Sequence, residues 1–269
     1  MKIKTAAIIA NSNKIDSPDN IRSLVKWLEK RDVKCVTEDT APQDSFFHAD
    51  FLIVLGGDGT VLKCAAEAAK NGIPVLGINT GNLGYLTDVD VSEMYISLEK
   101  VISGDYTVEK RMTLQAVLKD GYKAICLNEF CIEKRDTHMI MFDVSLNGEY
   151  VNTYRADGVL VATPTGSTAY NLSAKGPILK PCGNMIAITP ICPHDLFALP
   201  SVVSGDDTIT ITILPGAFAP AALSGDGKPI ATMNAGDNVT IQASAHCFSL
   251  IKTNALGFFE VLRKKMSYS

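Results

Sequence analysis

The first chemical signal in this chain is a glycine-rich turn that carries one carboxylate. The segment "LGGDGTVLKCA" (55–65) places Gly56, Gly57, Asp58 and Gly59 between an apolar run and a helix-like run. One interpretation is a tight strand-to-helix turn, with Asp58 as the helix cap. The other is a phosphate cradle, in which backbone N–H groups at the amino end of a helix hold phosphate oxygens.

A carboxylate beside a phosphate needs a function, because the two negative charges repel each other. Asp58 could bind Mg²⁺, or it could accept a proton from an attacking hydroxyl group. The turn therefore favours phosphoryl transfer over dinucleotide binding alone. The chain has neither the GxGxxG fingerprint of dehydrogenases nor a GxxxxGK[ST] P-loop.

A second glycine-punctuated loop, "NTGNLGYLTD" (79–88), follows another apolar run. Its Gly81 and Gly84 could be structural or could admit a ligand close to the backbone. Tyr85 could belong to the core or border a base.

Two polar residues interrupt the apolar strand-like segment "CLNEF" (126–130), namely Asn128 and Glu129. An unpaired buried carboxylate is costly, so a strand end that lines a polar site is favoured over the core. Neighbouring side chains point to opposite faces of an ideal strand, so both reach one ligand only at a strand end or bulge. Ribose hydroxyls suit such a pair.

The segment "YRADGVLVATPTGSTAYNLSAKGPIL" (154–179) is rich in small hydroxyl residues. They could form an ordinary Ser/Thr loop, or they could offer several short hydrogen-bond donors to a ligand. Arg155 and Asp157 favour the second interpretation, because they could pair with each other or address a polar ligand.

Alternating strand and helix signals surround the glycine turn. Apolar runs predict buried strands at 5–10, 50–55 and 73–79, and helical spacing predicts helices at 17–31, 60–72 and 92–103. Ser17 and Ser92 are the expected caps of the first and third helices. This order predicts a parallel sheet covered by helices, with ligands at the carboxyl ends of its strands.

From about residue 106 the segments become strand-like and are separated by glycine and proline turns. Expected strands lie at 113–118, 123–133, 138–155, 207–214 and 237–244, with a hairpin turn at Asn147-Gly148. A last helix is expected at 254–266. Its apolar face would comprise Leu256, Phe259, Val261 and Leu262.

Charge and cysteine usage restrict the possible partners. The 269 residues carry a net charge of -4, which gives no electrostatic footprint for nucleic acid. No apolar run reaches the length of a membrane span, and no lysine cluster suggests a membrane surface. Seven scattered cysteines without a CxxC pair predict reduced thiols in a cytoplasmic protein.

These motifs together resemble the NAD kinase family, which phosphorylates the 2′-hydroxyl of the adenosine ribose of NAD to make NADP. The matching segments span nearly the whole chain: "GGDGT" (56–60), "NTGNLGYL" (79–86), "NEF" (128–130), "RADG…TPTGSTAYNLSA" (155–174), "ICPH" (191–194) and "FFEVLRKKM" (258–266). GGDG alone also occurs in lipid kinases and phosphofructokinases, whereas "TPTGSTAY" with "NE" is more specific.

The resemblance implies a role for each matching residue. Asp58 would be the proton acceptor, and Gly56, Gly57 and Thr60 would form the phosphate cradle. Substrate-binding residues would be Gly59, Lys63, Tyr85, Asn128, Glu129, His138, Arg155, Asp157, Thr168, Ala169, Tyr170, Asn171, Leu172, Ser173 and Lys228, with Lys63 near the ligand phosphates. ATP, or polyphosphate, would supply the phosphoryl group, and the divalent metal ion, Mg²⁺, would be carried mainly by ATP rather than by a set of protein ligands.

The family architecture implies an α/β fold of two domains. A Rossmann-like α/β domain with a parallel sheet would comprise 1–105 and 251–269, and a β-rich, antiparallel sandwich-like domain that binds NAD would comprise 106–250. The family also implies a homodimer or homotetramer in which a neighbouring subunit helps to complete the NAD site.

Three departures from the family pattern affect the NAD site. Lys175 replaces a usual glycine, Lys228 replaces the glutamine of "DGQ", and the arginine usual before Pro200 is missing. Two other functions remain possible from the sequence. One is a GGDG kinase that acts on a lipid or sugar, and the other is a non-catalytic regulator that binds NAD(P).

Overall fold

A computed structural model describes residues 3–10, 18–37, 40, 43–87, 89–215, 220–253 and 257–266. The chain forms two compact units. Unit 1 comprises 1–110 and 247–269, and unit 2 comprises 111–246.

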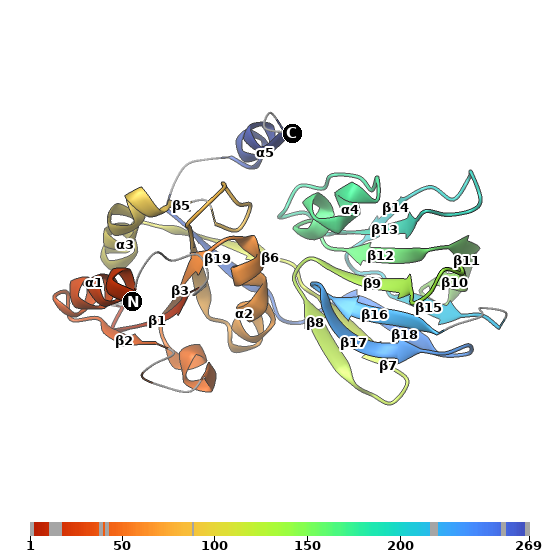
Figure 1. Cartoon of the computed structure of the whole chain (residues 1–269), viewed down its shortest axis with the longest axis horizontal. Helices are drawn as coiled ribbons and strands as arrows, with labels where there is room; N and C mark the ends of the chain where they lie inside the picture. Colours follow the sequence, from red (N-terminus) through yellow and green to blue (C-terminus); the bar gives the residue numbers. More distant parts are fainter. Residues whose placement is uncertain are drawn as a thin grey trace. The chain divides into compact units, whose positions relative to one another are not determined.

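Unit 1 contains a seven-stranded sheet whose order is β2-β1-β3-β4-β19-β6, with β5 paired to β4 (Figure 1). The pairings of β1 with β2 and β3, and of β4 with β3, β5 and β19, are all parallel. The strand bounds are β1 (Thr5–Ala10), β2 (Lys34–Val36), β3 (Phe51–Gly56), β4 (Pro74–Asn79), β5 (Val89–Asp90), β6 (Thr107–Arg111) and β19 (Phe248–Lys252). Continuous apolar sequence makes β3 buried along its whole length, as expected for a strand covered on both faces.

The helices of unit 1 are α1 (Pro18–Glu29), α2 (Asp58–Asn71), α3 (Met94–Ser103) and α5 (Phe258–Met266). Short 3₁₀ turns lie at Gln43–His48 and Val91–Glu93. The apolar face of α3 buries Leu98 and Val101 completely. Within the described residues no helix is long and apolar enough to cross a membrane.

The capping predictions had mixed outcomes. Gly72 ends α2 in the left-handed conformation, as the Asn71-Gly72 pair predicted. Ser92 does not cap α3, because it lies inside the 3₁₀ turn that precedes the helix. The backbone N–H and the hydroxyl group of Ser92 both donate hydrogen bonds to the side chain of Asp90. Ser17 lies outside the described residues.

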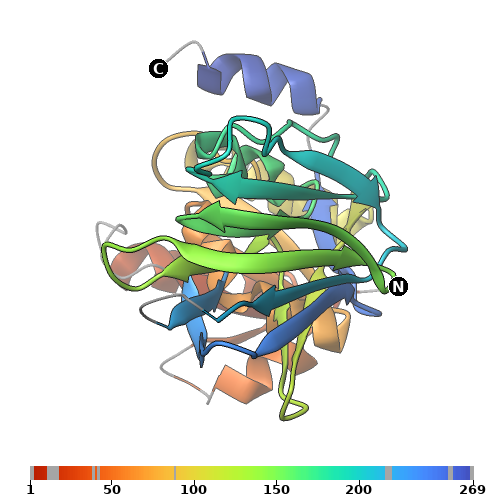
Figure 2. The same ribbon diagram turned by 90° about the vertical axis from the view of Figure 1, so that its right-hand side faces the viewer.

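Unit 2 is built from two six-stranded antiparallel sheets, seen in green to blue in Figure 2. One has the order β11-β10-β15-β18-β7-β8, with β7 (Leu114–Leu118), β8 (Lys123–Cys126), β10 (Ile140–Leu146), β11 (Glu149–Ala156), β15 (Ile209–Ile213) and β18 (Asn238–Ala243). The other has the order β14-β13-β12-β9-β16-β17, with β9 (Glu129–Lys134), β12 (Gly158–Ala162), β13 (Met185–Ile191), β14 (Ser201–Ser204), β16 (Ala221–Gly225) and β17 (Lys228–Met233).

A single hydrophobic core joins the two sheets of unit 2 into a sandwich. Buried side chains from both sheets belong to it, including Phe142 and Ile211 from the first and Phe130, Val161 and Leu223 from the second. Alternating burial along β15 and β18 is the pattern of strands with one face on a core. The fold is therefore the expected α/β unit plus an antiparallel β-rich unit.

Three details of the expected elements are corrected. The strand expected at 123–133 is two strands, β8 and β9, which are separated at Leu127-Asn128. Phe259, expected on the apolar face of the last helix, is 59% exposed, whereas Val261 and Leu262 are buried. Leu256 lies outside the described residues. The strands β6 and β19 both pair within the sheet of unit 1, so this unit extends to 110 and resumes at 247.

Candidate active site

Two loops of unit 1 meet at the carboxyl edge of its sheet. The strand β3 leads into the GGDG turn, and the neighbouring strand β4 leads into the loop of residues 80–87. Gly56 pairs with Asn79 in the sheet, so both loops begin at the same level. This edge of a parallel sheet is where α/β proteins bind ligands.

Asp58 is the first residue of α2, but its side chain does not cap that helix. Gly57 occupies the cap position and makes no side-chain bond. The Asp58 carboxylate instead accepts four hydrogen bonds from the neighbouring loop. The backbone N–H of Tyr85 donates to Oδ2 at 2.8 Å, and Oδ1 accepts from the N–H groups of Leu86 at 2.9 Å and Thr87 at 3.2 Å. The Thr87 hydroxyl completes the set at 3.2 Å from Oδ1.

This arrangement gives the two oxygens of Asp58 different surroundings. Oδ1 has three donors, whereas Oδ2 has one backbone donor and faces the Lys265 ammonium at 3.7 Å. The carboxylate is thus fixed in place while Oδ2 keeps room for a further partner. The interpretation of Asp58 as a helix cap is therefore wrong, because its side chain binds a different loop.

Two glycines allow this close approach. A Cβ on Gly84 would overlap both Asp58 Oδ1 and the Thr87 hydroxyl oxygen. A Cβ on Gly56 would overlap the Thr60 hydroxyl oxygen, and Gly56 also has a φ of +156°. Both positions therefore exclude any larger residue without a shift of their neighbours.

The other predicted residues of unit 1 lie around this turn. Gly59 is exposed, and a Cβ added to it would meet nothing within 4 Å, while Lys63 is exposed on α2. Thr60 is buried beneath Gly56. Tyr85 is half-buried, and burial, together with the negative charge of Asp58, raises the pKa of its phenol.

In unit 2, Glu129 is the first residue of β9 and Asn128 directly precedes it, as a strand-end site requires. The chain is held there by Asp226, whose carboxylate accepts from the N–H groups of Leu127 at 2.8 Å and Asn128 at 2.7 Å, and from that of Glu129 at 3.4 Å. Asp226 has a φ of +48°, in the left-handed region of the β16–β17 turn. A distant turn therefore fixes the backbone of the predicted NE pair.

Glu129 is a buried carboxyl group with an unsatisfied oxygen. Its side chain is 8% exposed, and among the described residues Oε2 has no hydrogen-bond partner. Burial, and next the negative charge of Asp226, raises the pKa of Glu129 to about 8. A buried polar atom without a partner is typical of a group that awaits a ligand.

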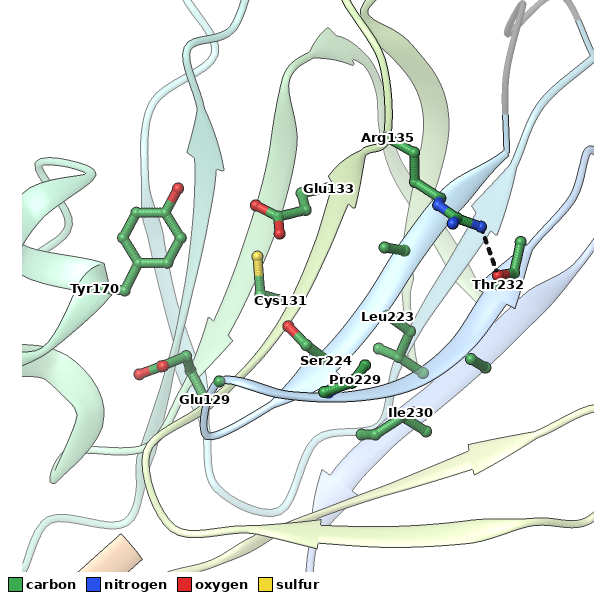
Figure 3. A pocket seen from close by; sticks show the side chains of 13 residues that line it. Glu129, Cys131, Glu133, Arg135, Tyr170, Leu223, Ser224, Pro229, Ile230 and Thr232 are labelled. Atoms are coloured by element: carbon green, nitrogen blue, oxygen red, sulfur yellow. Dashed lines mark hydrogen bonds between the residues drawn. The ribbon is translucent and has the colours of Figure 1, made fainter. Parts of the chain in front are cut away.

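Glu129 and Tyr170 line one pocket of about 620 Å³ in unit 2 (Figure 3). Figure 3 shows Cys131 and Glu133 between Tyr170 and Arg135, and Arg135 donates to the Thr232 hydroxyl at 3.0 Å. The volume suits a small-molecule site. Two of the residues predicted from separate motifs therefore share one pocket.

Much of the segment 163–173 forms an internal hydrogen-bond network rather than an open surface. Asn171 has no exposed surface: its Nδ2 donates to the carbonyl oxygens of Ser167 and Pro177, and its Oδ1 accepts from the Thr189 hydroxyl. These three hydrogen bonds give the side chain a structural role, and its contact with NAD stays a prediction. Thr168, Ala169 and Leu172 are half-buried beside it, whereas Tyr170 and Ser173 are exposed. The 3₁₀ turn Gly166–Thr168 and the short helix α4 (Tyr170–Ser173) hold these residues.

The remaining predicted residues of unit 2 are not among the described residues that line the pocket. Arg155 and Lys228 are exposed. Asp157 pairs with Lys134 at 2.7 Å, and not with Arg155. His138 is exposed and lies 3.6 Å from Asp136.

A divalent metal ion that arrives with nucleotide phosphates fits the residues described at the glycine turn. Among the described residues there is no group of three or more His, Cys, Asp or Glu that could hold a metal ion. Asp58 Oδ2 is a single oxygen with room for one further partner. Mg²⁺ is commonly bound by one or two carboxylates together with water and substrate phosphates, so the two observations are compatible with a metal ion that arrives with ATP.

A glycine turn that opens a helix and holds one oriented carboxylate, in a chain whose β-rich unit carries a pocket with a buried carboxyl group, is typical of a small-molecule phosphotransferase. Comparison with known families gives the particular group. Residues 28–106 match the ATP-NAD kinase N-terminal domain, and residues 127–253 match the ATP-NAD kinase C-terminal domain. The chain belongs to the ATP-NAD kinase family.

Relatives agree with this assignment over their full lengths. The chain is 37% identical to an NAD kinase of Heliobacterium modesticaldum, covering 97% of this chain and 98% of the relative. It is 38% identical to an NAD kinase of Thermoanaerobacter, covering 98% of this chain and 99% of the relative. Both relatives therefore match the two units together.

Solved structures share the fold. A crystal structure of yeast NADH kinase complexed with NADH has a TM-score of 0.91 at 24% identity, covering 100% of this chain and 89% of that one. An NAD kinase from Archaeoglobus fulgidus in complex with ATP has a TM-score of 0.80 at 25% identity, covering 98% and 97%.

Three residues of the site were missed from the sequence. Asp226 stands in "DGK", where only Lys228 was singled out, although an Asp-Gly pair signals a turn. Thr87 and Lys265 carry no local signal, because their contacts with Asp58 span 29 and more residues of chain.

Proposed function

We propose that this protein phosphorylates NAD with ATP, and that Asp58 accepts the proton of the 2′-hydroxyl group on the adenosine ribose. The observation that carries the role of Asp58 is its geometry: four donors from one loop fix the carboxylate, and Oδ2 accepts only one of these bonds on a side chain that is 28% exposed. A general base must be held within hydrogen-bond reach of the proton that it removes.

Transfer proceeds in one in-line step. The ribose oxygen forms a bond to the γ-phosphorus as the bond from this phosphorus to the bridging oxygen breaks, and the hydroxyl proton passes to Asp58 Oδ2. The open N–H groups at the start of α2 stabilise the phosphate charge. A bound Mg²⁺ ion, carried by ATP, neutralises part of that charge. Positioning alone can supply roughly 7–11 kcal/mol of the rate acceleration.

The β-rich unit holds the dinucleotide in this proposal. Glu129 and Tyr170 support this role because they line one pocket, and Glu129 Oε2 there lacks a partner among the residues that the structure describes. A ribose hydroxyl group would satisfy this oxygen and remove the cost of leaving it unpaired. The Tyr170 ring would stack on a base.

The test is the variant Asp58→Asn with NAD, ATP and Mg²⁺, and with NADP read by an NADP-specific dehydrogenase. Loss of a general base should lower kcat by roughly 10²–10⁴-fold. Asp90→Asn is the matched control, because Asp90 is an exposed carboxylate of the same unit whose side chain binds Ser92, outside the glycine turn and its loop. This control should keep kcat within about twofold of the wild type, as is usual for surface changes.

Two results would contradict the proposal. Wild-type turnover in Asp58→Asn would remove the proton-acceptor role, and phosphate transfer to diacylglycerol or a sugar phosphate instead of NAD would favour another kinase. Circular dichroism of both variants separates loss of activity from loss of fold.

We further propose a homodimer or homotetramer in the cytoplasm. Support comes from an exposed apolar patch in unit 2, where Leu196 is 91%, Phe197 88% and Leu199 67% exposed. Apolar patches of this kind mark interfaces more often than free surface. Light scattering of the purified protein measures the mass and so decides between monomer and oligomer.

A further inference from the structure

The C-terminal helix α5 brings a lysine to the carboxylate of Asp58. Lys265 Nζ lies 3.7 Å from Asp58 Oδ2 and 4.1 Å from the centre of the Tyr85 ring. The Lys265 and Asp58 side chains are 31% and 28% exposed, so solvent reaches both. Two separate contacts, an ion pair and a cation–π contact, thus place one ammonium group at the glycine turn.

The position of this lysine is fixed by the packing of α5 within unit 1 (dark blue in Figure 2). Val261 is 4% and Leu262 is 9% exposed, so one face of the helix is buried. The Phe258 ring of α5 lies 6.3 Å from the ring of Tyr85, and Tyr85 belongs to the loop that binds Asp58. The basic last turn is therefore held over this loop.

The contact between Lys265 and Asp58 can be exchanged at little cost. A distance of 3.7 Å is longer than a charge-assisted hydrogen bond of about 2.7–2.9 Å, so the pair lacks the strongest component of a buried ion pair. Asp58 already accepts four hydrogen bonds, and these remain when the ammonium group leaves. Partly exposed ion pairs are weak.

A pocket of about 650 Å³ adjoins the ammonium group. It is lined by Gly81, Asn82 and Leu83 from the loop after β4, and by Lys264 and Lys265 from α5. Two lysines and no carboxylate among these lining residues favour an anion. Because Lys265 touches the first residue of α2, the same ammonium group also lies near the N-terminus of that helix, which favours phosphate.

We propose that Lys265 binds the phosphates of the nucleotide that donates the phosphoryl group, and that before this nucleotide binds the same ammonium group caps Asp58. When the nucleotide enters, Nζ exchanges Oδ2 of Asp58 for a phosphate oxygen. Only hydrogen bonds and ion pairs change in this step. Oδ2 is then released for the acceptor hydroxyl group. The release of Oδ2 for the acceptor hydroxyl group rests on the proposed function of Asp58. The contact between Lys265 and the nucleotide phosphates does not depend on it.

One consequence is that ATP binding makes Oδ2 of Asp58 available to the acceptor hydroxyl group of NAD. Without ATP, the ammonium group competes with the acceptor hydroxyl group for Oδ2, and with ATP this competition ends. The two substrates should therefore bind with positive coupling, since each favours the state in which Lys265 has left Asp58.

The first experiment measures the affinity of a non-hydrolysable ATP analogue by calorimetry, with Mg²⁺ present. Lys265→Met should weaken binding about tenfold or more, the loss expected for one charge-assisted contact to a phosphate. Lys265→Arg keeps the charge and should recover most of the affinity. Arg263→Met is the matched control: it removes a charge from the same turn of α5, at an exposed residue outside the described pocket lining. Unchanged affinity in Lys265→Met, or an equal loss in Arg263→Met, overturns the proposal.

The second experiment measures NAD affinity with and without the ATP analogue. The wild type should bind NAD about five- to tenfold more tightly with the analogue, at the lower end of the usual range of coupling between sites. Lys265→Met should show little or no coupling. Coupling of wild-type size in this variant overturns the capping role.

The two proposals can fail separately. If Asp58→Asn keeps wild-type turnover but Lys265→Met loses affinity for the analogue, the base assignment is wrong and the phosphate contact stands. If Lys265→Met is normal in both binding experiments while Asp58→Asn is inactive, the phosphate contact of Lys265 is wrong and the base assignment of Asp58 stands. Thermal unfolding of each variant shows whether a loss reflects unfolding of α5.

Discussion

Asp58 shows how one side chain can organise a site and also act in it. Its Oδ1 accepts from Leu86 and from both donors of Thr87, which ties the loop after β4 to the start of α2. Its Oδ2 has a single backbone donor, from Tyr85. Because donors hold both oxygens, the direction of the carboxylate is fixed, and little ordering remains to be done when a hydroxyl group arrives.

Glu129 gives a prediction for stability against pH. Its pKa of about 8 in the folded protein lies above the ordinary value of 4.5, so the folded state binds the proton more tightly than the unfolded state. This contribution is fully present below pH 4.5 and is lost as the pH rises through 8. Glu129→Gln, which stays neutral, should therefore gain stability over the wild type by roughly 2–4 kcal/mol at pH 9 and much less at pH 5.

Urea unfolding of both proteins at the two pH values measures this difference. A stability difference that is the same at pH 5 and pH 9 would contradict the raised pKa. Bound NAD should reduce the difference if its ribose hydroxyl groups satisfy Glu129 Oε2, because the ligand then stabilises the charged group.

The sequence pointed to residues of the site such as Glu129, but it did not show which residues they contact. The polar pair Asn128-Glu129 stood out because a carboxylate in apolar sequence is costly, and Glu129 proved to be buried with an oxygen unsatisfied by the described residues. Asp226, which holds that pair, is 97 to 99 residues away along the chain. No local pattern carries such a contact, and the same holds for Lys265 and Asp58.

At the scale of elements, the loop after β4 and the helix α2 depend on each other. The loop offers its N–H groups to Asp58 only because Gly84 lacks a side chain, since a Cβ there would overlap Oδ1. Gly84→Ala must therefore push the loop away from α2 or turn the carboxylate. Overpacking of this kind costs roughly 1–3 kcal/mol.

We expect Gly84→Ala to lower both thermal stability and kcat, since the base and its loop shift together. Gly257→Ala is the matched control in the same unit, because a Cβ there meets nothing within 4 Å and its φ is not in the left-handed region. Differential scanning calorimetry and the NADP assay measure the two effects. Wild-type kcat in Gly84→Ala would show that the loop does not fix the position of Asp58.

The elements that the hydrophobic pattern determines were predicted correctly. The features that depend on tertiary contacts were missed. The apolar runs of β1 and β4 and the end of α2 at Gly72 lie where the sequence placed them. The predicted cap of α3 was wrong because a 3₁₀ turn, capped by Asp90, precedes the helix, and α3 itself starts after Glu93 without a side-chain cap. The break between β8 and β9 is imposed by Asp226, which binds the N–H groups of residues 127–129.

At the scale of the whole molecule, the two units differ in how the chain builds them. Unit 2 is one continuous segment, 111–246, and its ends meet, since the Ser244 N–H donates to the Thr113 carbonyl oxygen at 2.8 Å. Unit 1 needs two segments. Its strand β19 lies between β4 and β6 in the sheet and comes from the far end of the chain.

This difference predicts which part of the chain folds alone. The residues of the sandwich core lie between 112 and 241, so the fragment 111–246 contains its whole core and should unfold cooperatively in urea. The fragment 1–110 is the matched comparison. Without β19 it has no strand to join β4 to β6. It also leaves Pro74 and Val75 of β4 without their partner strand, so it should show no cooperative transition.

Circular dichroism during urea titration distinguishes the two fragments. Adding a peptide of residues 247–269 to the fragment 1–110 should restore a transition, because it supplies β19 and α5 together. A cooperative transition of 1–110 without the peptide would show that unit 1 does not depend on its second segment. Failure of 111–246 to unfold cooperatively would show that the sandwich core is not sufficient for folding.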